Sequence, residues 1–449
     1  MAWTYGTATD YRDLLGRLID FLTGHPDLVA SGQNWTLMRL FAPIAQILGS
    51  VANPQLAFDA NATTDVVSSD PFPQWVGVRT ACRFEPQTYL VRASASNPGA
   101  SPRDFALEWS DDGISWTAAD TRTGITWTAG ERKDFTLTAP VGAHSHWRLR
   151  VDATAAGTLA MATLEFLLPA DGLNGVINSS YTSGAPQAVF RAPGLAGAEE
   201  IYCGIRAFQD ATAGWYFWDL QGFIGFNPAN DFYAQPGAVG GWNVGMSLWN
   251  APIPYWFVAN GRRVVVVAKV STVYEAAYLG FIKPYATPGQ YPYPLLAGGS
   301  MTGQRGRNYS VTSPNHRHFV DPGEDGQNNA NTACMLRGPS GAWLPFQNSY
   351  YSSAEYRYDG PRPVWPTNYG YLGNVREAPD GRYVLSPVVL TQNNSGTDHD
   401  LFGELDGCYW VSGFNNAAEN LINVGGVDHL VVQNVYRTSV RDYWALRLE

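Results

Sequence analysis

Two pairs of histidines have the spacing of metal ligands. One residue separates His144 from His146, and one separates His316 from His318. Residues i and i+2 of a strand face the same side, so both imidazoles of a pair could reach one ion. Carboxylates follow the second pair within residues 319–325, so His316 and His318 are the better candidate ligands of a structural metal. The competing interpretation is a polar loop, because two donors rarely suffice. No other cofactor is expected.

A second group of residues that could take part in catalysis is acidic. Asp398, Asp400, Glu404 and Asp406 lie close together in the sequence, and glycosidases need two carboxylates at a set separation. Acidic residues among glycines and asparagines usually form turns instead. No nucleophile elbow, phosphate loop or Ser-His-Asp set stands out. We therefore predict a protein that is not an enzyme, with glycan cleavage as the competing hypothesis.

Tryptophans form the third group. The run Trp215-Tyr216-Phe217-Trp218 places large rings on both faces of a predicted strand. One face could stack on sugars, or both faces could be covered, one by the chain's own core and one by a neighbouring subunit. We take Trp75, Trp215 and Trp218 as candidates for glycan stacking or for an interface.

Short strands must position most of these residues. From about residue 53 apolar and polar residues alternate, with Gly- and Pro-rich turns between the runs. The predicted strands are 87–96, 104–110, 134–140, 146–154 and 163–168. Together they predict a β-sandwich over residues 53–169.

The second half, residues 170–449, predicts one or two further β domains, with a division near residue 300. Asn260-Gly261 between two apolar runs is the strongest hairpin signal in the chain. Further strands are predicted at 200–208, 214–226, 276–286, 382–392 and 429–438.

The N-terminal segment, residues 1–52, predicts a helical attachment arm, or else a first packing layer. An apolar stripe at helical spacing begins after Thr9 or Asp10, either of which can cap a helix, and Gly24 ends it. A second apolar run, residues 35–48, suits a strand, a helix or both.

Composition limits the function classes. With 449 residues, two or three domains are expected, and aromatic residues reach 13% while charged residues are only 15%. This mixture is typical of short strands and also of buried interfaces, whose cores are poor in charge. The net charge of −10 argues against nucleic-acid binding.

The four cysteines are far apart, without metal-finger spacing, and predict free buried thiols formed in a reducing cytosol. The first 24 residues lack the basic start and apolar core of a signal peptide. No stretch is long enough to span a membrane, so no membrane insertion is expected.

The motif Ser110-Asp111-Asp112-Gly113, followed by Trp116, predicts a tight turn rather than a calcium site, with Gly113 at positive φ and the indole packed back on the sheet. With the later strand "HWRLR", the motif resembles the discoidin family, also called coagulation-factor type C or galactose-binding-like domains. The resemblance implies a jelly-roll sandwich in which this hairpin is scaffold. Family members often bind sugars or membranes through loops at one end of the barrel.

Residues 200–210, 249–295 and 403–449, and the opening residues 7–23, resemble virion structural proteins of tailed bacteriophages. The resemblance implies a component of the tail tip or baseplate, synthesised and assembled in the bacterial host cytoplasm and located in the virion.

The partners so implied are other tail or baseplate proteins, joined through large aromatic-rich interfaces, and further copies of the chain in a trimer or a multiple of three. Some phage fibres hold a metal on the threefold axis through His-x-His. The alternative function is a receptor-binding module that recognises host surface polysaccharide through the discoidin-like domain.

Overall fold

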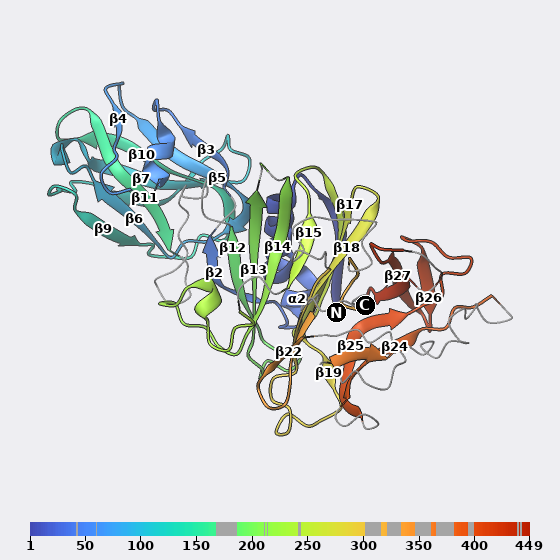
Figure 1. Cartoon of the computed structure of the whole chain (residues 1–449). Coiled ribbons are helices and arrows are strands. Elements are labelled where there is room, and N and C mark those ends of the chain that lie inside the picture. The colour runs from blue at the N-terminus through green and yellow to red at the C-terminus, as the bar shows by residue number, and fades with distance from the viewer. Residues whose placement is uncertain are drawn as a thin grey trace. The chain divides into compact units, whose positions relative to one another are not determined.

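The structure is a computed structural model that describes residues 1–41, 44–59, 61–167, 186–210, 212, 214–240, 244–300, 316–320, 334–345, 361–364, 381–393, 399–437, 440 and 442–449. Nearly all of its regular structure is β-strand (Figure 1), which confirms the prediction of a mainly β chain with a helix near the N-terminus. Contacts divide the chain into two units. The sandwich unit comprises Leu15–Asp20 and Leu37–Val189, and the body unit comprises Met1–Leu14, Phe21–Thr36 and Phe190–Glu449.

The sandwich unit contains two antiparallel sheets. The first has the order β3 (Ile44–Gly49), β5 (Gln74–Phe84), β10 (His144–Thr154), β7 (Pro102–Ser110) and β8 (Thr117–Arg122). The second has the order β4 (Val66–Ser68), β11 (Leu159–Leu167), β6 (Thr88–Ala93) and β9 (Arg132–Thr136). Short 3-10 helices η1 (Pro54–Phe58) and η2 (Pro98–Ala100) lie between strands.

Aromatic rings from both sheets form the core of this sandwich. Trp147 of β10 lies 6.1 Å from Phe166 of β11, and Phe105 of β7 meets Phe135 of β9 edge-on at 5.3 Å. Along β10 the buried Trp147, Leu149 and Val151 alternate with partly exposed arginines. This period of two is what a sheet with one covered face requires, and the predicted short-strand sandwich is confirmed.

Two larger sheets build most of the body unit. One has the order β1 (Ala2–Ala8), β16 (Ile253–Ala259), β17 (Arg263–Val270), β18 (Val273–Phe281), β20 (Leu295–Gly298), β21 (Cys334–Arg337) and β22 (Trp343–Pro345). The other has the order β23 (Pro361–Val364), β24 (Ser386–Asn393), β25 (His399–Trp410), β28 (Tyr443–Arg447), β27 (Val427–Gln433) and β26 (Leu421–Val424), and β19 (Lys283–Pro284) pairs with β25. One apolar cluster joins side chains of both sheets, including Val258, Tyr278, Trp444 and Leu446.

A further five-stranded sheet has the order β15 (Gly245–Leu248), β14 (Trp215–Phe223), β13 (Ile201–Asp210), β12 (Gln187–Ala192) and β2 (Thr36–Phe41). The 3-10 helix η4 (Phe232–Ala234) follows β14. The ring of Phe232 in η4 meets that of Phe223 in β14 edge-on at 5.9 Å, so η4 packs on this sheet.

The predicted helix is present as α1 (Tyr11–Gly24), followed by the short α2 (Pro26–Ala30). Asp10 caps α1, since its carboxylate accepts hydrogen bonds from the backbone N–H groups of Arg12 and Asp13. The rest of the segment predicted as an arm is strand: residues 2–8 form β1 and the apolar run 35–48 forms β2 and β3.

The hairpin predicted at Asn260-Gly261 is present between β16 and β17. Its turn differs from the expected primed type, because neither residue has a positive φ. Asn260 Oδ1 accepts hydrogen bonds from the backbone N–H groups of Arg262 and Arg263. A Cβ at Gly261 would lie 1.9 Å from the carbonyl oxygen of Gly194, so close backbone approach is what requires glycine here.

Cys203, Cys334 and Cys408 are free and buried, as predicted for these three. Burial raises the pKa of the Cys408 thiol to about 12 and raises that of Cys203 and of Cys334 as well. The side chain of Cys82 lies outside the described residues. Among the helices of the described residues, none has the length and apolar character that crossing a bilayer requires.

Candidate functional site

The candidate metal ligand His318 lies in the core of the body unit. Its side chain is fully buried and both ring nitrogens have partners. Nε2 lies 2.7 Å from the carbonyl oxygen of Tyr274, and the indole N–H of Trp444 donates to Nδ1 at 2.9 Å. Burial lowers the pKa of His318 to about 3, so the ring is neutral at ordinary pH.

His316 is equally buried and contacts a buried carboxylate. Its Nε2 lies 2.9 Å from Glu275 Oε1, and the hydroxyl of Ser300 donates to the same carboxylate. Among the described residues no group of three or more His, Cys, Asp or Glu could hold a metal, and the carboxylates of 321–325 lie outside them. His316 and His318 therefore do not offer two open ring nitrogens to one ion.

The predicted carboxylate cluster is divided among separate partners. Asp398 lies outside the described residues, and Glu404 pairs with Lys283 at 2.5 Å. Asp406 contacts the fully buried Arg263 at 3.2 Å. Burial pushes the pKa of Asp406 up, but the charge of Arg263 and the Asn260 hydrogen bond outweigh it, so this pKa lies below its ordinary value. Glu404 and Asp406 each support packing through their own cation.

Two of the candidate stacking residues occupy opposite faces of β14, since an odd number of positions separates them. Trp218 is fully buried and its indole N–H donates to the carbonyl oxygen of Tyr11 at 3.1 Å. Trp215 is partly exposed. Burial in the chain's own core removes Trp218 from the glycan-stacking candidates.

The third candidate, Trp75 of β5, belongs to an aromatic cluster of the sandwich unit. Its ring lies 6.3 Å from that of Trp116, and the guanidinium of Arg148 sits 5.2 Å from the first ring and 4.1 Å from the second. Glu108 accepts from Arg148 Nε at 2.6 Å. A Cβ at Gly77 would come within 2.7 Å of Arg148 Cβ, so glycine makes room for this arginine. Trp75 is thus held by a cation–π contact within its own unit.

The turn predicted at Ser110–Gly113 is confirmed. Asp112 Oδ1 accepts from the backbone N–H groups of Ile114 and Ser115 at 2.8 and 2.7 Å, and these bonds hold the pKa of Asp112 well below its usual value. Gly113 has φ +71, and Trp116 packs back on the sheet as predicted. Asp112 is a turn former.

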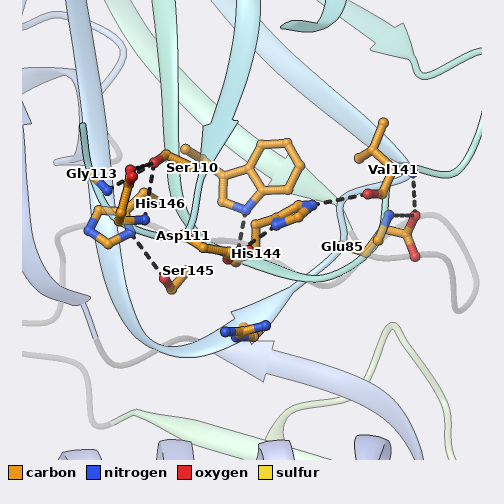
Figure 2. A network of polar contacts seen from close by, with 12 residues as sticks. Glu85, Ser110, Asp111, Gly113, Val141, His144, Ser145 and His146 are labelled. Carbon is orange, nitrogen blue, oxygen red and sulfur yellow. Dashed lines mark hydrogen bonds and ion pairs between the residues drawn. The ribbon is translucent and has the colours of Figure 1, made fainter. Parts of the chain in front are cut away.

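Its neighbour Asp111 faces another way, toward His144 (Figure 2). His144 Nδ1 lies 3.2 Å from Asp111 Oδ1, and Nε2 lies 3.0 Å from the carbonyl oxygen of Val141. The ring also stacks on Trp109 at 3.5 Å. His144 contacts the rings of Trp109 and Trp147, whereas His146 lies against Trp116 at 6.4 Å, past a register shift between β10 and β5, so this pair does not share a face. His144 instead ties the turn after β7 to the loop before β10.

Glu85, which follows β5, fixes the same loop from its other side (Figure 2). Its Oε1 accepts hydrogen bonds from the backbone N–H groups of Val141 and Gly142 at 2.8 and 2.9 Å. Nothing in the sequence marks Glu85 as special, because its partners lie more than fifty positions away.

Beside Glu85 the sandwich unit has a surface depression of about 210 Å³, here called the Glu85 depression. Three of its polar groups have no hydrogen-bond partner within the described part of the chain: Glu85 Oε2, the Gln87 side-chain amide and the Thr138 hydroxyl. Apolar atoms of prolines and leucine complete the wall. The lining residues are Glu85, Pro86, Gln87, Leu137, Thr138, Ala139 and Pro140.

No protein-family model matches this chain, and no curated protein matches it. Among solved structures, CpGH89CBM32-5 from Clostridium perfringens, in complex with GalNAc-β-1,3-galactose, is 14% identical with a TM-score of 0.24, and the match covers 27% of this chain and 94% of that one. The family 32 carbohydrate-binding module of C. perfringens NanJ, in complex with galactose, is 17% identical with a TM-score of 0.23, over 29% and 96% of the two chains. Chitosan-binding module 1 of a chitosanase/glucanase from Paenibacillus sp. IK-5 is 19% identical with a TM-score of 0.24, over 28% and 96%.

Proposed function

We propose that the sandwich unit is a carbohydrate-binding module and that the Glu85 depression holds one sugar residue of a surface polysaccharide. The observation that carries the proposal is that Glu85, Gln87 and Thr138 line one depression together with proline and leucine residues, while their free polar groups make no hydrogen bond within the described residues. A concave, partly apolar surface with a few placed polar groups is the usual form of a small-ligand site.

The chemistry of the three groups suits a polyol. A carboxylate accepts hydrogen bonds from neighbouring hydroxyls, an amide both donates and accepts, and the Thr138 hydroxyl does the same. A bond to the charged carboxylate is the strongest of these. The volume of about 210 Å³ is below the range of drug-sized pockets, which favours a single ring at the end or along the side of a polymer.

The carboxylate is also held in place before any ligand arrives. Two backbone N–H groups fix Glu85 Oε1, and His144 fixes the carbonyl of Val141 in the same loop. Binding then costs little ordering of this side chain. Trp75 and Trp116 lie in the same unit. We propose that they stabilise this face of the sheet rather than bind the sugar, because Arg148 already contacts both rings.

In the whole chain we propose that this module serves host attachment, without catalysis. The setting, a bacteriophage tail assembled in the host cytoplasm, rests on the sequence resemblance of residues 200–210, 249–295 and 403–449. Mass spectrometry of virions purified from a lysate of the producing bacteria tests this setting. The chain should be present in the particles, and its absence would refute the virion assignment.

A glycan array probed with the full chain tests the binding function, followed by calorimetric titration of the best ligand. Glu85→Gln should weaken binding by about 10- to 100-fold, since a hydrogen bond to a charged group contributes about 1.5–3 kcal/mol. Thr138→Val should weaken binding less, by up to about 10-fold.

Glu131→Gln is the matched control, because Glu131 also accepts a backbone N–H bond, from Thr128, at a position outside the depression. It should bind like the wild type. An array without any bound saccharide, or equal binding by Glu85→Gln and wild type, would refute the proposal.

A further inference from the structure

Strand β1 forms one end of the seven-stranded sheet of the body unit. It pairs on one side with β16, from Ala2 opposite Ala259 to Ala8 opposite Ile253. Within the described residues, no other backbone hydrogen bond involves residues 2–8. Alternate N–H and C=O groups of β1 therefore point outward from the sheet, in the pattern that accepts a further strand.

This edge lacks the features that usually block strand addition. Residues 1–9 include no charged side chain and no proline, and the pairing with β16 has no register shift. Native edge strands normally carry charges, prolines or bulges, because open edges pair with other chains. An edge of seven residues without any of these is suited to pairing.

The exposed side of β1 is aromatic. Trp3 is 40% exposed and Tyr5 is 70% exposed, and their rings stack at 6.2 Å. Thr7 continues the same row. The opposite side of the strand packs inward, where Ala2 and Ala8 are fully buried. An added strand would therefore cover backbone groups and extend an aromatic row at the same time.

We propose that β1 pairs antiparallel with β1 of a second copy of this chain, about a twofold axis at Tyr5. Pairing centred there uses the whole strand and places Tyr5 opposite the second copy's Tyr5 and Trp3 opposite the second copy's Thr7. Residues directly opposite in an antiparallel pair lie on the same face, so the two aromatic rows become continuous.

A second copy suits this edge better than an unrelated strand for two reasons. The strand is complementary to itself, since each large ring meets either its twin or the small Thr7. Each copy also carries a net charge of −10, and β1 is an uncharged stretch where two acidic chains can approach without repulsion between opposed side chains. Twofold self-association is the commonest form of oligomer. It differs from the threefold association that the tail resemblance implies.

Sedimentation velocity of the full chain over a range of concentrations tests the pairing. A dimer, of twice 49.1 kDa, should form, and Tyr5→Lys should raise its dissociation constant by at least about 10-fold, because two like charges would then lie opposite each other. Leu421→Lys is the matched control, since Leu421 is also an exposed apolar side chain, 61% exposed, on the end strand β26. It should leave the dimer unchanged.

The register has its own test. The double variant Trp3→Lys/Thr7→Glu should dimerise more tightly than Trp3→Lys alone, since opposite charges would face each other twice across the axis. In a second assay, Tyr5→Cys should form an intermolecular disulfide on mild oxidation, because directly opposed residues lie within disulfide reach. Thr4→Cys, one position away, should not.

Thermal melting of each variant identifies any that fails to fold, and the cysteine pair then still decides the question. A wild type that stays monomeric at all concentrations, or a dimer that survives Tyr5→Lys, would overturn the proposal. Glycan binding is measured separately on the sandwich unit's variants, so the two proposals fail independently.

Discussion

The two His-x-His pairs have the same spacing but opposite surroundings. His316 and His318 are fully buried in the body unit, where a carboxylate, a carbonyl oxygen and an indole engage their ring nitrogens. His144 and His146 lie where β10 begins, on either side of a register shift. The first pair supports a core, whereas in the second pair His144 alone joins two loops, through Asp111 and Val141.

The difference shows that residue spacing alone does not define a site. A period of two places both rings on one face only while the strand stays regular, and a bulge cancels it. A ring nitrogen is available to a ligand only when the fold does not already supply its partner.

The largest effect is expected in the body core. His316→Ala removes the ion-pair partner of the fully buried Glu275, which then keeps only the hydrogen bond from Ser300, and breaking a buried pair in this way costs about 3–5 kcal/mol. Urea unfolding followed by tryptophan fluorescence should show this loss in the transition of the body unit. A cost below about 1 kcal/mol would mean that the pair is open to solvent.

The next effect is a dependence on pH. Folded His318 stays neutral down to its pKa of about 3, whereas in the unfolded chain it takes up a proton near 6.5. The stability it contributes is therefore complete above pH 6.5 and is lost as the pH falls toward 3, at about 1.4 kcal/mol per pH unit.

Unfolding free energies at pH 7 and pH 5 measure this loss, and His318→Gln is the control. The variant should lose about 2 kcal/mol less than the wild type between the two pH values. Equal pH dependence in both proteins would contradict the assignment, since Glu275 and His316 remain in each.

A smaller effect is expected at the loop histidine. His144→Ala removes the stack on Trp109 and the bonds to Asp111 and Val141, and we expect a cost of about 2 kcal/mol. Hydrogen exchange should locate the change in the loop before β10. A loss as large as that of His316→Ala would erase the contrast between the pairs.

The smallest effect is expected in the turn after β7. Gly113→Ala places a side chain at φ +71 and 3.2 Å from His146 Nε2, at a cost of about 1 kcal/mol. Differential scanning calorimetry should show a small drop in the melting temperature of the sandwich unit. Gly124→Ala, which has a similar φ and open space around its Cβ, separates backbone strain from the contact.

Local features of the fold followed from the sequence. Asp10 and Gly24 bound α1, the alternation on β10 indicated one buried face, and Asn260-Gly261 marked a hairpin. These signals act over a few residues. The close approach of Gly194 to Gly261 could not be predicted, because it joins segments far apart in the chain.

The candidate site depended on such distant contacts. Glu85 accepts a hydrogen bond from the loop at Val141. Arg148 contacts Trp75 and Trp116, and these three residues come from three different segments of the chain. Strand order and register determine these meetings, and composition does not reveal them. The sequence left open which face of β14 the chain itself covers, because rings occupy both faces of that strand, and the structure places Trp218 on the covered face.

The three buried thiols can report how often parts of the body unit open. Cys203, Cys334 and Cys408 are protected by packing and by raised pKa values, so a thiol reagent can modify them only when the surrounding strands separate. The rate of alkylation at each cysteine then reports the local opening free energy of its own sheet. Cys203 lies on β13, Cys334 on β21 and Cys408 on β25, each in a different sheet. One alkylating reagent followed by peptide mass analysis would therefore rank the three sheets by their frequency of local opening.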